Sequence, residues 1–211
     1  MEYFLFRQTF IKLILFLLLF SFSAVKTAYS QTTMIRDAEI ENTIKKFSYE
    51  IFKVANLNPE NISIHLIKDN RINAFVAKGQ NLFIHTGLLT QSETPDQVIG
   101  VIAHETGHIA GGHIARLSGQ NEKTGQAMLL STIAGGAAML ASGRSDVGAA
   151  VALGGMSSSM GSYFSYRRSE ENAADEFATK ALEKTEQSSL GLLQFLKKIN
   201  RQDALLNDNQ D

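Results

Sequence analysis

Two histidines and a glutamate fall close together in the run His104-Glu105-Thr106-Gly107-His108. On an α-helix, residues four apart lie about 40° apart and one turn along the axis, so both imidazoles can reach one metal ion. Glu105 stands beside them, where a carboxylate can take a proton from a water that zinc acidifies toward neutral pH. Gly107 is expected to leave room for a substrate backbone. This H-E-x-x-H pattern of zinc metalloproteases predicts His104 and His108 as metal ligands and Glu105 as the catalytic residue.

A third ligand is needed, and the composition of the chain limits which side chains can supply it. There is no cysteine, so the ligand must be His, Asp or Glu. His113 lies five residues beyond His108, about 140° around a continuous helix, and is therefore expected to face away from the metal. Ile114 stands where metzincins carry their third histidine, which excludes that class.

Acidic residues further along the chain are stronger candidates for the third ligand. Glu171 and Asp175 are four apart and share one face of a predicted helix. Glu170 projects about 100° away from Glu171, so these two cannot both be ligands. His65 and His85, on predicted strands, remain as alternatives, although lone histidines usually satisfy local hydrogen bonds.

Hydrophobic periodicity predicts the elements that must hold these residues. Apolar side chains repeat at helical spacing over residues 40–54 and alternate over residues 62–66, which indicates a helix followed by a strand. Residues 72–77 and 82–86 form a predicted hairpin, completing a small antiparallel sheet. The zinc motif lies on a helix expected over residues 94–118, because its first residues, Thr-Pro-Asp-Gln, favour a helix start. We therefore predict a helix-dominated α+β zincin fold.

Residues 125–162 are rich in Gly, Ala, Ser and Met, and Arg144 and Asp146 are their only charges. Two apolar pieces flank these charges, and a glycine pair interrupts each piece. Each piece is shorter than the roughly 20 residues of a membrane-spanning helix. The segment is predicted to be a helical hairpin packed on the core or, alternatively, a cover that lies over the active site or touches a membrane.

The first thirty residues have the features of an export signal. Arg7 and Lys12 precede an apolar run, and Ala28-Tyr29-Ser30 is a small-residue cleavage pattern. We expect residues 1–30 to be a signal peptide, with an uncleaved membrane anchor as the alternative, and residues 31–211 to form one zinc metallopeptidase domain. The net charge of −1 over 211 residues gives no electrostatic basis for binding nucleic acid.

The combination of motifs resembles a known family. His-Glu-Thr-Gly-His at 104–108, followed by Glu-Asn-Ala-Ala-Asp at 171–175, is similar to the gluzincin metallopeptidases, which include the CAAX prenyl-protein endopeptidases, HtpX and Oma. Residues 73–75 and 83–89 resemble the hairpin that precedes the zinc helix in that family. The resemblance covers residues 35–199, and the expected signal peptide favours the family's periplasmic branch of β-barrel-assembly-enhancing proteases.

This resemblance implies one zinc ion held by His104, His108 and Glu171. It also implies that Asp175 orients one of the ligand histidines from behind, as carboxylates do in many zinc sites.

Two further groups of residues are predicted to contact the substrate. The resemblance implies that the strand at 82–86, which carries Phe83 and His85, edges the cleft and pairs with an extended peptide. Tyr166 and Arg168 are candidates for stabilising the oxyanion of the tetrahedral intermediate.

The predicted function is that of a zinc-dependent endopeptidase cleaving internal peptide bonds. The resemblance implies polypeptide substrates, namely misfolded envelope or outer-membrane proteins, and a periplasmic location with peripheral membrane contact as an option. The alternative is a non-catalytic periplasmic chaperone or assembly factor that keeps the zincin fold. The intact Glu105 favours the enzyme.

Overall fold

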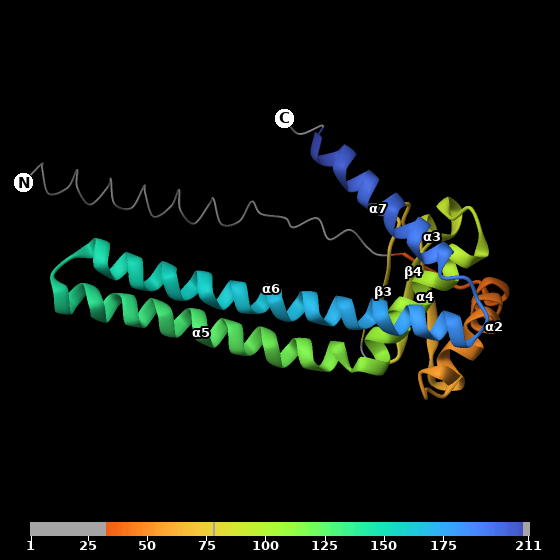
Figure 1. The fold of residues 1–211 in the computed structure, drawn as a ribbon, viewed down its shortest axis with the longest axis horizontal. Coiled ribbons are helices and arrows are strands. Elements are labelled where there is room, and N and C mark those ends of the chain that lie inside the picture. The colour runs from red at the N-terminus through yellow and green to blue at the C-terminus, as the bar shows by residue number, and fades with distance from the viewer. Residues whose placement is uncertain (1–32, 78, 209–211) are drawn as a thin grey trace, which may run out of the picture. The chain divides into compact units, whose positions relative to one another are not determined.

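The computed structural model describes residues 33–77 and 79–208, which fall within one compact unit, Thr33–Asp211 (Figure 1). The predicted signal peptide, residues 1–30, lies outside the described residues. The helix-dominated α+β fold is confirmed. The helices are α2 (Ala38–Val54), the short η1 (Pro59–Asn61), α3 (Thr86–Gln91), α4 (Pro95–Gly111), α5 (His113–Ser142), α6 (Ser145–Lys184) and α7 (Leu190–Asp208). The strands are β1 (Met34–Ile35), β2 (Ser63–Ile67), β3 (Ala74–Ala77) and β4 (Asn81–His85).

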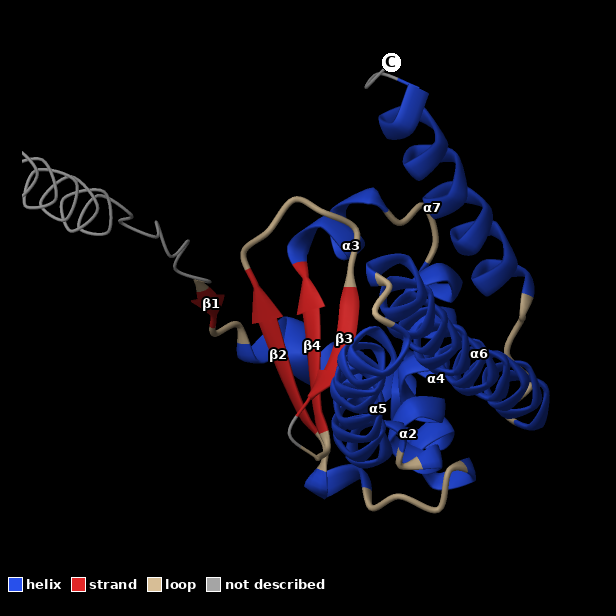
Figure 2. Cartoon of the chain, turned by 90° about the vertical axis from the view of Figure 1, so that its left-hand side faces the viewer, coloured by secondary structure: helices blue, strands red, loops and turns tan. Residues whose placement is uncertain are grey.

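The strands form one mixed sheet in the order β1-β2-β4-β3 (Figure 2). β3 and β4 pair antiparallel, which confirms the predicted hairpin. β2 and β4 pair parallel, so the prediction of a wholly antiparallel sheet is wrong. After β2 the chain crosses to the far edge, forms β3 there, and turns back to insert β4 between them. A parallel neighbour needs such a crossover, and the local alternation of side chains does not reveal it.

The strand order also changes which strand edges the active site. β4 has a hydrogen-bonded neighbour on each side, so the prediction that it is an edge strand presenting Phe83 and His85 to a substrate is wrong. Phe83 instead stacks between the rings of His65 and Phe75, with centroids 4.8 and 5.0 Å away. His85 is buried. The edge position belongs to β3.

Helix α4 lies at the centre of the unit, between the sheet and the helices α6 and α7. Val101 and Ile102 pack on the sheet side of α4. Ile99 and Ala103 pack on the side of the helices. On the helix side, a Cβ on Gly107 would lie 3.0 Å from the Cα of Ala174. Gly107 therefore admits α6 rather than a substrate backbone. This close approach brings Glu171 beside the zinc motif.

The helix that carries the motif is shorter than predicted. α4 ends at Gly111, and Gly112 adopts the left-handed conformation with φ +65°, its N–H bonded to the carbonyl of Ile109. Glycine is the residue that most readily takes this conformation at a helix end. The predicted continuous helix over 94–118 is thus wrong, and the chain turns into α5 at His113.

Helices α5 and α6 form a long antiparallel hairpin that extends away from the sheet (Figure 1). Residues 125–162 lie within it, joined at the tip by Gly143, which has φ +66°. Both helices run unbroken through their glycine pairs. None of residues 125–162 lines the cleft described below.

Candidate metal centre and active-site cleft

Three atoms converge where the sequence predicts the metal ligands. His104 Nε2 and His108 Nε2 are 3.1 Å apart, and Glu171 Oε2 lies 3.5 Å from each of them. Ligand atoms about 2.0–2.1 Å from a tetrahedral zinc lie about 3.3–3.4 Å from one another. The triangle therefore has the dimensions of one face of a zinc site. Two histidines and a carboxylate that leave a fourth position free are also the donor set of catalytic zinc in peptidases.

The first histidine is held from behind by a carboxylate. Asp175 lies one turn after Glu171 on α6, and its Oδ1 is 2.8 Å from His104 Nδ1. A carboxylate at this distance accepts the Nδ1–H, which leaves the lone pair of Nε2 directed at the triangle. The structure therefore brings Asp175 to one of the two motif histidines, His104.

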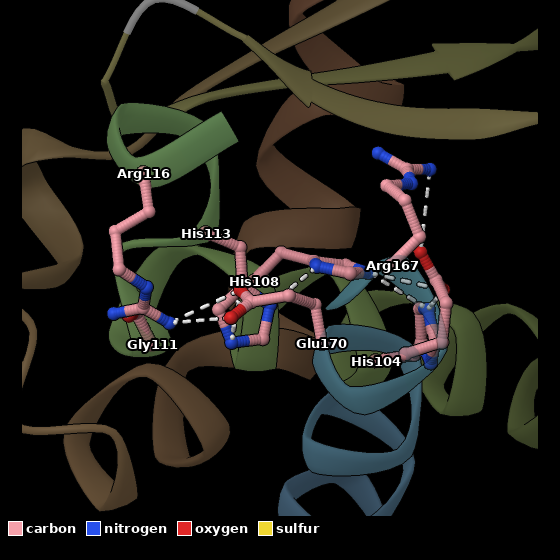
Figure 3. Close-up of polar contacts among 8 residues, drawn as sticks. His104, His108, Gly111, His113, Arg116, Arg167 and Glu170 are labelled. Carbon is pink, nitrogen blue, oxygen red and sulfur yellow. Dashed lines mark hydrogen bonds and ion pairs between the residues drawn. The ribbon is translucent and has the colours of Figure 1, made fainter. Parts of the chain in front are cut away.

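The second histidine is held by a chain of side chains (Figure 3). His108 Nδ1 is 2.7 Å from His113 Nδ1, and His113 Nε2 is 3.1 Å from Glu170 Oε2. Arg116 Nη2 lies 3.0 Å from both carboxylate oxygens of Glu170. His113 donates Nε2–H to the carboxylate, so its Nδ1 accepts the proton of His108 and fixes the tautomer of that ligand.

This series of side-chain contacts corrects the prediction for His113 and shows what Glu170 contacts. The prediction that His113 faces away is wrong, because the turn at Gly112 redirects the backbone before His113. Glu170 does not belong to the triangle, and its carboxylate instead pairs with His113, which in turn contacts His108. The double glycine at 111–112 was the sequence signal for this turn.

Burial controls the protonation of the groups beside the triangle. Burial and, to a smaller extent, the nearby Glu171 carboxylate raise the pKa of Glu105 to about 8, although a hydrogen bond from the Val76 backbone acts in the opposite direction. A pKa near neutrality suits a group that must take up and return a proton. Burial, followed by the neighbouring His104, lowers the pKa of His108 to about 4. The imidazole is then uncharged at neutral pH, which is the form that binds a metal.

A cleft of about 310 Å³ opens over these groups, and α6 supplies one wall. Tyr166 lines it, and its hydroxyl is buried near the Arg116 guanidinium. Arg168 does not line the cleft and is exposed, so it is poorly placed for the predicted oxyanion role. Arg167 lines the cleft instead, with Nη2 3.5 Å from Glu171 Oε1.

Helical geometry explains why Arg167, and not Arg168, lines the cleft. At 100° per residue, Arg167 lies about 40° from Glu171 on the side that also carries Glu170, whereas Arg168 lies about 60° away on the opposite side. The sequence therefore contained the signal for Arg167, in its spacing of four from Glu171.

The edge strand β3 forms the opposite wall of the cleft through Phe75 and Val76. The backbone N–H of His85 bonds to the carbonyl of Asn73, and hydrogen-bonded pairs alternate along an antiparallel ladder. The N–H and C=O groups of Ala74 and Val76 therefore point away from β4. One of them, the Val76 N–H, bonds to the catalytic candidate Glu105.

The fold and this site define a metallopeptidase domain in which one helix carries two histidines and a second helix carries the carboxylate. Residues 34–206 match peptidase family M48, and the chain belongs to this family. The resemblance noted from the motifs is thereby confirmed.

Relatives of this chain include proteases of bacteria and mitochondria. The beta-barrel assembly-enhancing protease of Escherichia coli strain K12 is 23% identical over 175 residues, which is 83% of this chain and 36% of that protein. The protein of the same name from Yersinia pestis is 24% identical over 148 residues, or 69% of this chain and 30% of the relative. The mitochondrial metalloendopeptidase OMA1 of Schizosaccharomyces pombe is 34% identical over 65 residues, or 31% of this chain and 19% of the relative. The chain spans about a third of the length of the two bacterial relatives.

Proposed function

We propose that this chain is a zinc-dependent endopeptidase that hydrolyses internal peptide bonds. The observation that carries the proposal is the triangle of His104, His108 and Glu171, which has the dimensions of a zinc site and adjoins the buried Glu105. When bound there, zinc polarises a substrate carbonyl and acidifies a water.

The remaining chemistry falls to side chains of this protein. Glu105 takes the proton from the attacking water and returns it to the leaving amine, a shuttle that its pKa near neutrality permits. Asp175 and His113 keep the two imidazoles in the tautomer that presents Nε2. Arg167 and Tyr166 line the cleft, where they can stabilise the oxyanion.

The substrate is a polypeptide in extended form. Besides the Val76 N–H, which bonds to Glu105, the outward groups of β3 are the N–H and C=O of Ala74 and the C=O of Val76. They offer a strand edge beside Glu105 with which a peptide backbone can pair. Pairing through the backbone accepts many sequences, which suits an enzyme that removes misfolded chains.

We place this activity in the periplasm, in quality control of envelope or outer-membrane proteins. Two observations support this role: the export signal expected in residues 1–30, and the similarity to proteins named beta-barrel assembly-enhancing protease. The substrates themselves are part of the proposal.

Digestion of an unfolded protein such as casein tests the activity. The purified chain should cleave casein, a zinc chelator should stop the cleavage, and added zinc should restore it. A zinc-loaded protein that suppresses aggregation of casein without cleaving it would instead establish the chaperone alternative.

A further inference from the structure

The α5–α6 hairpin presents a large apolar surface that no other described element covers. Exposed apolar side chains occur along both helices, including Leu140 at 86% exposure and Ile133 at 59%. On α5 they spread over about 180° of the helix circumference, at 100° per residue. These residues are Leu129, Leu130, Ile133, Met139 and Leu140 on α5, and Val151, Leu153, Met156 and Phe164 on α6.

The charges of the hairpin are confined to its two ends. Residues 124–142 of α5 and residues 147–166 of α6 contain no charged side chain. Arg144 and Asp146 lie together at the tip, where they form an ion pair. At 1.5 Å per residue the two uncharged arms are each about 29–30 Å long, which equals the hydrocarbon thickness of a bilayer.

The base of the hairpin has the side chains that favour a membrane surface. Lys123 ends the uncharged arm of α5, and Arg167 and Arg168 end that of α6, where they can meet anionic headgroups. Tyr163 and Phe164 lie within one turn of these arginines, as in the aromatic belts of membrane proteins.

The contact between the two helices also suits lipid surroundings. A Cβ on Gly135 would lie 2.6 Å from the carbonyl oxygen of Gly148, so the two backbones are packed through small residues. The hydroxyls of Ser131 and Ser159 bond to carbonyls four residues earlier in their own helices, which satisfies these polar groups without water. Of the described helices, α5 alone is apolar enough by composition to cross a membrane, and α6 packs along it.

We propose that the α5–α6 hairpin inserts into a lipid bilayer, with its tip at the far headgroups and its base at the near ones. A protein partner would require one apolar stripe, whereas the surface here surrounds the outward half of α5 and ends at charged residues near the base of each arm. The glycine pairs that suggested pieces too short to span lie inside continuous helices. The proposal does not depend on zinc or on catalysis.

Insertion would place the catalytic cleft at the membrane surface. Glu171 lies five residues beyond Tyr166, which is about 7 Å along α6 from the end of the uncharged arm. The polypeptides that reach the cleft are then those at or emerging from the bilayer surface.

Single tryptophans test the insertion, because the chain has no tryptophan of its own. Full-length Ile133→Trp and Leu140→Trp variants are mixed with vesicles of phosphatidylethanolamine and phosphatidylglycerol whose acyl chains carry bromine at different depths. Ile133 lies about 14 Å from the start of its arm, so its fluorescence should be quenched most by the deepest bromines. Leu140→Trp should be quenched most by bromines near the headgroups. Phe47→Trp, 48% exposed on α2, is the control and should show no depth-dependent quenching.

Three results would overturn the proposal. Emission at long wavelength without quenching would mean that the hairpin stays in water. Emission shifted to short wavelength without quenching would mean that protein, such as a second copy of this chain, covers it. Equal quenching at positions 47 and 133 would mean that the contact is not specific to the hairpin. Zinc content and casein cleavage are measured separately and test the proposed function, so none of these three results bears on it.

Discussion

Replacing His113 by alanine should weaken zinc binding although His113 lies outside the ligand triangle. His108 Nδ1 is 2.7 Å from His113 Nδ1, so the substitution removes the acceptor that fixes the tautomer of His108. Loss of such a partner typically weakens metal affinity about 10–100-fold. That range corresponds to about 1.4–2.7 kcal/mol of binding free energy.

Zinc affinity can be measured by competition with a chromogenic chelator, with circular dichroism as the check on folding. His65→Ala is the control, because it removes an imidazole that does not line the cleft and whose Nε2 lies 2.9 Å from Asn81 Oδ1. Glu170→Gln changes the residue that His113 contacts on the side away from His108. It should weaken zinc affinity by less than about tenfold, since His113 stays in place. A folded His113→Ala protein whose zinc affinity equals that of His65→Ala would refute the reasoning.

The other predictions concern the third ligand and the packing around α4. Glu171→Ala should lose stoichiometric zinc, whereas Glu170→Ala should keep it with lower affinity, as metal analysis of the purified proteins would show; the reverse order would mean that the wrong carboxylate is assigned. Gly100→Ala should destabilise the fold by about 1–3 kcal/mol, because the new Cβ would lie 2.7 Å from the Cβ of Leu192. Gly119→Ala, with nothing within 4 Å, should instead stabilise its helix by up to about 1 kcal/mol. Equal melting temperatures for these two variants would contradict the described packing of α4 on α7.

Local patterns were sufficient to place the zinc motif on a helix, although not to predict where that helix ends. The histidines of the motif share one turn of one helix, so helical geometry alone brings His104 and His108 together. Glu171 was predicted from its spacing to Asp175 and from the family resemblance, and the structure places its carboxylate at the third corner of the triangle.

The other predictions failed because they depended on tertiary structure, which local sequence patterns do not reveal. A single residue in the left-handed conformation, Gly112, turns the backbone so that His113 faces the metal site instead of pointing away from it. The order of the strands depends on a crossover between β2 and β3, which leaves no mark on the alternation within a strand. The choice between Arg167 and Arg168 depended on which side of α6 faces the cleft, and this is set by the packing of Gly107 on Ala174.

The central claim is that Glu105 acts on a water at a zinc site formed by two helices. The most direct test compares the wild-type chain with Glu105→Gln, by measuring zinc per chain and the rate of casein cleavage on the same preparations. We expect about one zinc per chain in both proteins, and a cleavage rate that falls about 10²–10⁴-fold in the variant. Equal cleavage by the two zinc-loaded proteins, or no cleavage by the wild type, would contradict the proposed function.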